Sequence, residues 1–193
     1  MNIRLIKAAS FVSNNWGGGS TTELFCFPDT ASYTERNFDF RLSTATVEAE
    51  TSTFTPLEGV DRTLMVLEGS MTLAHENHHS KLLNKFEIDR VNGGWKTTSQ
   101  GKCSDFNLMT RGGVKGDVKG VIIEQGKSID YHLEDKSNWQ FIYVTKGSLN
   151  VDINSNSDQL QLGDLLVIQN PVAAKMILLA SATAEIVLVE IRR

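Results

Sequence analysis

The chain has 193 residues, of which 40% are hydrophobic and 22% charged, and its formal net charge at pH 7 is −4. This composition is typical of a globular protein with enough apolar material for a sizeable core. The acidic balance and the lack of a Lys/Arg run argue against a nucleic-acid surface, which needs a basic patch, and no stretch is long and apolar enough to span a membrane.

The N-terminal segment, MNIRLIKAASF, has two cations but no apolar core of the kind found in a signal peptide. The two cysteines, Cys26 and Cys103, are far apart and have no metal-like spacing. Both observations predict a cytoplasmic protein whose cysteines are free thiols.

The first distinctive stretch is NWGGGSTTEL at residues 15–24. No Lys follows the glycines, so the stretch is not a P-loop. Ser20 and Glu23 have the spacing of a helix capping box, but the LFCFP that follows, closed by Pro28, is typical of a strand. We therefore predict a tight glycine bend that enters a strand.

Most of the remaining chain alternates between apolar and polar residues with a period of two, which is the pattern of half-buried strands. Gly, Asn, Asp or Pro separates the segments, and there is no convincing amphipathic helix of about ten residues or more. Many short strands with regular turn signals predict an all-β sandwich or barrel. The segments are FDFRLSTATVE (38–48), RTLMVLEGSMTL (62–73), DFNLM (105–109), GVIIEQ (120–125), WQFIYVTKGSLNVDI (139–153), DLLVIQ (164–169), AKMILLA (174–180) and AEIVLVEI (184–191).

The chain also contains an internal repeat. LMVLEGSMTL at 64–73 resembles IYVTKGSLNV at 142–151, with a Gly-Ser pair at the same place in both. Such a repeat predicts two similar β units, and the glycine-rich TRGGVKGDVKG at 110–120 lies between them. The expected units are an N-terminal barrel over residues 1–111, a connection over 112–120 and a C-terminal barrel over 121–193, with an exchange of strands between the halves left open.

The second half resembles a cupin, a small β-barrel in which histidines and a glutamate bind a metal. Its first motif is matched in spacing by Gly126, His132, Glu134, Gln140 and Gly147. His132 holds the first His position, but Glu134 replaces the second His and Gln140 replaces the Glu. The second motif is echoed by LQLGDLLVIQNP without the His that should follow it. In the first half, the same count back from Gly69 puts Arg62 at the metal-Glu position, facing inward.

A transition-metal site needs three or four converging ligands. His75, His78 and His79 lie in AHENHHS, which is typical of a solvated hairpin loop and has no carboxylate at ligand spacing. His132 is the one histidine expected to point inward, as a core residue. We therefore expect a cupin-like architecture without a metal or other cofactor.

Four motifs carry a closer family resemblance: WGGGSTTEL, FDFRLSTATVE, STFTPLEGVDRTLMVLEG and SDFNLMTR. In this order and spacing they resemble the HutD/Ves family, over the chain from about residue 10 to about residue 190. The resemblance implies an all-β bicupin without known catalysis. It also implies, for some members, a restraining role beside histidine-utilisation enzymes through sensing of urocanate or formylated glutamate products.

The family motifs coincide with polar strand faces. Arg41 and Ser43 share a face of one predicted strand, and Asp105 and Asn107 share a face of another. Two interpretations are open. Either an inward arginine is paired permanently with an internal carboxylate such as Asp105 or Glu23, or it binds a ligand carboxylate in a small pocket whose other polar groups hold the far end of the ligand.

The glycine bend also has two interpretations. It either lies at a barrel mouth and presents backbone N–H groups and hydroxyls to the pocket, with Trp16 as an apolar wall, or it lets one strand cross closely over another. The predicted ligand-binding residues are Trp16, Gly18, Gly19, Thr21, Thr22, Glu23, Arg41, Ser43, Arg62, Asp105 and Asn107.

No catalytic residue is predicted, because neither cysteine has a His partner in sequence and no Ser-His-Asp order is visible. Three functions are carried forward: a non-catalytic carboxylate-binding regulator of histidine or amino-acid utilisation, a cupin-type enzyme such as an isomerase with a degenerate metal site or none, and an interaction module with a vestigial pocket. The expected partner is a small carboxylate of the urocanate or formylglutamate kind, with no nucleic acid and no membrane, and with a homodimer left open.

Overall fold

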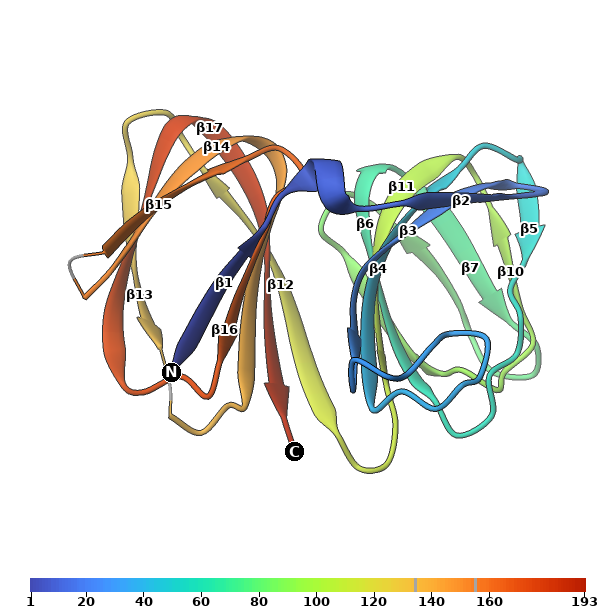
Figure 1. Ribbon diagram of the computed structural model, residues 1–193. Coiled ribbons are helices and arrows are strands. Elements are labelled where there is room, and N and C mark those ends of the chain that lie inside the picture. Colours follow the sequence, from blue (N-terminus) through green and yellow to red (C-terminus); the bar gives the residue numbers. More distant parts are fainter. Residues whose placement is uncertain (134, 155) are drawn as a thin grey trace. The chain divides into compact units, whose positions relative to one another are not determined.

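Figure 1 shows the computed structural model of the protein, in which residues 1–133, 135–154 and 156–193 are described. The described elements are antiparallel β-strands, apart from one 3-10 turn, η1 (Ala8–Ser10). This confirms the all-β prediction. Glu134, which was predicted to replace a cupin histidine, lies outside the described residues.

The chain divides into two compact units, Phe11–Val114 and Met1–Ser10 together with Lys115–Arg193. The predicted boundaries placed the first ten residues in the first barrel. In the structure, β1 (Asn2–Ile6) pairs with β16 (Leu165–Gln169) of the second half. A five-residue strand carries too little pattern to indicate a partner so far along the chain.

The unit Phe11–Val114, all of which is described, contains two antiparallel sheets. The six-stranded sheet has the order β2-β3-β4-β11-β6-β9, and the four-stranded sheet has the order β5-β10-β7-β8. The strands are β2 (Ser13–Trp16), β3 (Gly19–Phe27), β4 (Phe40–Val47), β5 (Thr51–Thr53), β6 (Asp61–Gly69), β7 (Met71–His75), β8 (Ser80–Leu83), β9 (Ile88–Asn92), β10 (Thr97–Gln100) and β11 (Cys103–Thr110).

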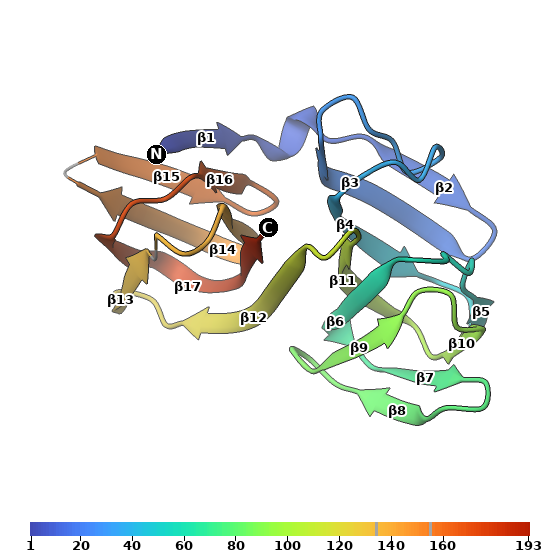
Figure 2. The same cartoon turned by 90° about the horizontal axis from the view of Figure 1, so that it is seen from below.

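Both sheets of this unit contribute to one core, around which the strands curve in Figure 2. Leu64 and Val66 come from β6, and Met71 and Leu73 come from β7. The opposite face of the six-stranded sheet is apolar as well: the Phe40 ring stacks on the rings of Phe25 and Phe27, with centroids 5.8 and 5.5 Å apart. Burial on both faces explains why strand alternation there is incomplete.

The other unit is a seven-stranded sheet with the path β1-β16-β14-β17-β12, in which β13 pairs with β17 and β15 with β14. Its core is built from aliphatic side chains such as Leu149, Val151 and Ile186. Its remaining strands are β12 (Lys115–Ile123), β13 (Ser128–Leu133), β14 (Trp139–Ile153), β15 (Asn156–Gln161) and β17 (Ala174–Arg192). Within the described residues, no helix has the length and apolarity required to cross a bilayer.

The repeated Gly-Ser pair marks the same turn in both units. Gly69 and Gly147 have φ angles of +77° and +72°. A Cβ on Gly69 would lie 2.6 Å from the Lys102 carbonyl oxygen, and a Cβ on Gly147 would lie 2.2 Å from that of Thr183. The left-handed backbone and the close neighbouring strand both require glycine.

We predict that Gly147→Ala destabilises its unit more than Gly126→Ala does. Gly126 has a similar φ of +74°, but a Cβ there would meet nothing within 4 Å. The left-handed conformation disfavours Ala by about 1–2 kcal/mol at either site, and the clash at Gly147 should add roughly 1–3 kcal/mol. Denaturant unfolding measures both losses, and equal losses would show that the strand contact does not constrain this glycine.

Candidate functional site

A group of polar side chains lies on the inner face of the six-stranded sheet. Met109 of β11 pairs with Arg41 of β4 on one side and with Arg62 of β6 on the other. Two residues earlier on β11, Asn107 pairs in the same way with Ser43 of β4 and Leu64 of β6. Leu64 belongs to the unit's core, so this face points into the barrel. The register therefore brings the predicted residues of three strands, Arg41, Ser43, Arg62, Asp105 and Asn107, onto one inner face.

Arg41 is held by internal partners. Its Nε donates a hydrogen bond to Glu23 Oε2 at 2.6 Å, and its Nη1 donates to Ser43 Oγ at 2.9 Å. The guanidinium carbon lies 4.6 Å from the centre of the Tyr33 ring, close enough for a cation–π contact. Arg41 and Glu23 thus form the kind of permanent internal pair that was one of the two interpretations of an inward arginine.

Asp105 is fully enclosed and accepts a hydrogen bond from Asn107 Nδ2. Burial raises the pKa of the Asp105 carboxyl to about 7, against the opposing effects of the Asn107 hydrogen bond and the Arg62 charge. A carboxyl with such a pKa changes charge near neutrality, so the interior of this barrel is sensitive to protons.

Arg62 is buried without a matching set of partners. Its side chain is 7% exposed, and its Nε has no hydrogen-bond partner. The guanidinium carbon lies 5.1 Å from the centre of the Phe54 ring. Burial lowers the pKa of Arg62, while Tyr33 and Asp105 act to raise it. An arginine stays protonated even so, so a cation lies here with part of its hydrogen-bonding capacity unused.

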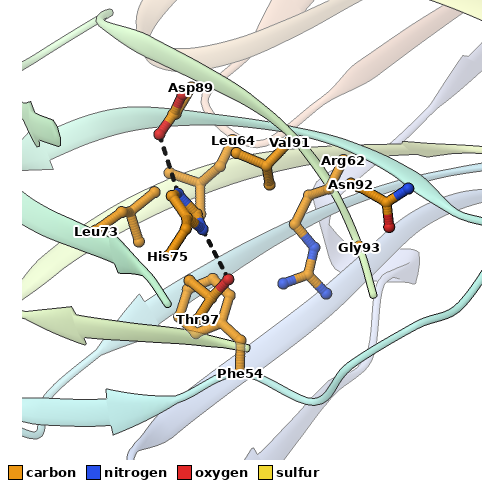
Figure 3. Close-up of a pocket in the computed structure, with 10 residues that line it drawn as sticks. All are labelled: Phe54, Arg62, Leu64, Leu73, His75, Asp89, Val91, Asn92, Gly93 and Thr97. Atoms are coloured by element: carbon orange, nitrogen blue, oxygen red, sulfur yellow. Dashed lines mark hydrogen bonds and ion pairs between the residues drawn. The ribbon is translucent and has the colours of Figure 1, made fainter. Parts of the chain in front are cut away.

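A small cavity opens beside this guanidinium, as Figure 3 shows. Its volume of about 10 Å³ is about the room that one water molecule needs. Among the described residues that line it, Arg62 is the one that belongs to the predicted binding set. The lining residues are Phe54, Arg62, Leu64, Leu73, His75, Asp89, Val91, Asn92, Gly93 and Thr97.

His75 and Asp89, which line the same cavity, form a cluster with His79 that the sequence analysis did not predict. His75 Nε2 lies 3.1 Å from Asp89 Oδ2, and His79 Nε2 lies 3.0 Å from the same oxygen. His75 is a buried residue that ends β7, so its assignment to a solvated loop was wrong. Asp89 is paired with the core residue Leu64 in the register of β9 and β6, which turns it inward. Alternation in IDRVN, combined with that pairing, would have revealed it.

The glycine bend is a β-hairpin, in which Trp16 pairs with Gly19 across Gly17 and Gly18. The Trp16 ring folds back over Gly18, where a Cβ would lie 2.2 Å from a ring carbon. Trp16 Nε1 also donates a hydrogen bond to Thr21 Oγ1 at 3.1 Å.

Gly19 lies against the neighbouring strand, because a Cβ there would come within 1.8 Å of the Thr46 carbonyl oxygen. Thr22 Oγ1 shares a 2.6 Å hydrogen bond with Ser13 Oγ on an exposed part of the hairpin. These contacts correspond to the close-crossing interpretation of the bend, and none of these residues is among those lining the cavity.

The match to the cupin motif in the second half predicted that the side chain of His132 points inward, and this prediction was wrong. That residue is exposed on β13, whereas its neighbour Leu133 is buried. Gln140, at the metal-Glu position, is buried and donates a hydrogen bond from Nε2 to Ser137 Oγ at 3.0 Å. Exposed His132 and buried Gln140 therefore do not share a ligand-binding face.

Both cysteines are free thiols, as predicted. Burial raises the pKa of Cys26 to about 11 and that of Cys103 to about 12. Neither is a thiolate near neutral pH, so neither is suited to act as a nucleophile.

The model of the HutD family matches residues 8–188. The chain belongs to the HutD family. The HutD/Ves resemblance is thereby confirmed, and the predicted bicupin fold is shared with solved structures. No curated protein matches the sequence.

Solved structures share the fold of this HutD-family chain. A conserved protein of unknown function from Pseudomonas aeruginosa PAO1 has a TM-score of 0.87 at 22% identity and covers 100% of both chains. HutD from Pseudomonas fluorescens SBW25, solved in a formate condition, has a TM-score of 0.76 at 19% identity, over 99% of this chain and 98% of its own. A formate complex of Lactobacillus farciminis oxalate decarboxylase has a TM-score of 0.73 at 10% identity, over 99% of this chain and 86% of its own.

The buried carboxyl of Asp105 should make stability fall as pH rises. Its folded pKa of about 7 lies above the ordinary value of 3.8, so folding takes up a proton between these values. The penalty for ionising it is absent below about pH 4 and complete above about pH 7. Asp105→Asn keeps an oxygen to accept the Asn107 hydrogen bond and cannot ionise.

The difference in unfolding free energy between Asp105→Asn and the parent should therefore grow in favour of the variant from pH 4 to pH 8. Its size is a few kcal/mol, since one pKa unit corresponds to about 1.4 kcal/mol. Urea unfolding across this range measures the difference, and a constant difference would contradict the buried ionisation.

Proposed function

We propose that this HutD-family protein is a non-catalytic binder of small carboxylates that regulates histidine utilisation, with Arg62 as the anchor for the ligand. The observation that carries the proposal is the buried guanidinium whose Nε has no hydrogen-bond partner beside a cavity. The family supplies the pathway, and the site supplies the chemistry of the ligand.

Arg62 is better suited to this role than Arg41. A buried charge is destabilising unless hydrogen bonds and an opposite charge replace its hydration. Arg41 obtains both from Glu23 and Ser43, so a ligand would have to displace them. At Arg62 a carboxylate would supply what is missing, because its two oxygens match the paired N–H groups of a guanidinium.

The size of the cavity sets a condition on binding. Room for about one water molecule is too little for a carboxylate, so the site must widen. The Phe54 ring, partly buried and over the Arg62 guanidinium, is the side chain whose rotation would open it. Once opened, the site would place a carboxylate on Arg62. Asp105 and Asn107 share the inner face with Arg62 but do not line the cavity, so the site would also have to widen toward them before they could hold the other end of the ligand.

One structural neighbour was solved in a formate condition and another as a formate complex. These facts concern those proteins, but they support a small carboxylate as the ligand class to test here. Binding without turnover is favoured by Arg62 at the position where the cupin pattern has a metal-binding glutamate, and by cysteines whose pKa values are raised.

We expect Arg62→Met to weaken the binding of a small carboxylate by about tenfold to a hundredfold or more, because a charge-assisted bidentate contact contributes a few kcal/mol. Methionine keeps much of the apolar stem. Calorimetric titration with urocanate, formylglutamate and formate measures the loss and ranks the ligands.

Arg90→Met is the matched control, since Arg90 follows Asp89 on β9 but is exposed. It removes the same charge from the same unit without touching the cavity, so its affinity should equal that of the parent. If the parent binds none of the three carboxylates, the proposal is wrong. If Arg62→Met and Arg90→Met bind equally well, Arg62 is not the anchor.

A further inference from the structure

We propose that His75, His79 and Asp89 form a binding site for one divalent transition-metal ion, with zinc as the representative ion. Each residue offers one ligand atom, and the three atoms all lie within 4.8 Å of one another. Imidazole nitrogen and carboxylate oxygen are ligands of zinc, and two histidines with one carboxylate are the protein ligands of known catalytic zinc sites. This inference does not depend on carboxylate binding at Arg62.

The distances suit a tetrahedral ion. Ligand atoms about 2.0–2.1 Å from a tetrahedral zinc lie roughly 3.3–3.4 Å apart. Asp89 Oδ2 is 3.1 Å from His75 Nε2 and 3.0 Å from His79 Nε2, so these two spacings need a shift of only about 0.2–0.4 Å, and the two histidine ligand atoms lie within 4.8 Å of each other. Figure 3 shows His75 directed toward Asp89 on one side and toward Thr97 on the other.

Thr97 orients His75 in the way that metal-binding histidines require. Its Oγ1 lies 2.8 Å from His75 Nδ1 and 3.3 Å from the Trp95 carbonyl oxygen. When the hydroxyl donates to that carbonyl, it accepts from His75 Nδ1–H, and the lone pair of Nε2 then points at Asp89. In this tautomer two acceptors face each other at 3.1 Å, and a metal ion between them would remove their repulsion. Hydrogen bonding of the second ring nitrogen is a regular feature of metal-ligating histidines.

The hairpin between β7 and β8 fixes the two histidines side by side. His75 N donates to the His79 carbonyl at 2.8 Å, and Asn77 takes a left-handed φ of +63° in the loop. The ring centroids of His75 and His79 are consequently 4.7 Å apart. β9 supplies Asp89 through its pairing with β6. The hairpin and β9 thus bring three ligand atoms within 4.8 Å of one another.

The surroundings leave a position for a fourth ligand. The His79 side chain is 42% exposed, whereas those of His75 and Asp89 are buried. Water or a ligand group can therefore reach an ion from the side of His79, as in zinc sites that have three protein ligands. His78 is directed elsewhere: its ring stacks on Trp95, with centroids 3.6 Å apart.

The test is a calorimetric titration of chelator-treated full-length protein with zinc chloride at pH 7.5. The expected result is one zinc per chain with a dissociation constant in the micromolar range or below. His79→Gln and Asp89→Asn should each weaken binding by at least about tenfold, and Thr97→Val, which removes only the orienting hydroxyl, by about tenfold to a hundredfold.

His78→Gln is the matched control, because it removes a histidine from the same loop that is not a ligand, and His132→Gln removes the exposed histidine of the other unit. Both should bind zinc as the parent does. Thermal unfolding of each variant without metal verifies that it is folded. Absence of stoichiometric binding by the parent, or zinc binding that persists in both His79→Gln and Asp89→Asn, would overturn the proposal.

Discussion

The desolvation of charged groups inside a small β-barrel is the constraint on which the Phe11–Val114 unit depends. A charge removed from water is strongly destabilising unless protein groups replace the lost hydration. Arg41 meets this requirement with two hydrogen bonds and Asp105 with one from Asn107, while Arg62 rests against an aromatic ring. Strand register must hold firmly here, because a slip of one residue would exchange the polar inner face for the apolar outer one.

The two repeated units share the same turn but have cores of different composition. Gly69 and Gly147 form the same left-handed turn against a neighbouring strand. Beyond the turns, the unit of Lys115–Arg193 fills its core with aliphatic side chains such as Leu149 and Ile186, which supports stability and little chemistry. Among the described residues, the unit of Phe11–Val114 encloses the buried arginines Arg41 and Arg62 and the buried carboxyls Asp89 and Asp105, whereas the other unit buries the carboxyls Asp164 and Glu185.

Strand alternation was sufficient to predict which polar residues share the inner face, because side-chain direction in a strand follows from a period of two alone. Alternation was insufficient to predict the histidine cluster, because Asp89 lies beside His75 only through the pairing of β9 with β6. The sequence of neither strand alone specifies the register of that pairing. The prediction for His132 was wrong because the motif spacing fixes its position in the sequence but not the direction of its side chain on β13, where the residue is exposed. The sequence motifs therefore predicted the fold correctly, but they did not predict the direction of every side chain.

The pairing of β1 with β16 has a consequence for how the protein is made. Synthesis proceeds from the N-terminus, so Asn2–Ile6 leaves the ribosome long before its partner Leu165–Gln169 exists. The continuous unit Phe11–Val114 can complete its sheets meanwhile, as domains that emerge early tend to do. The first strand must wait as an unpaired edge, a state prone to wrong pairing, and its polar residues Asn2 and Arg4, alternating with the apolar ones, help to keep it soluble. Closure of the second barrel is therefore a long-range event that cannot take place before β16 has been synthesised.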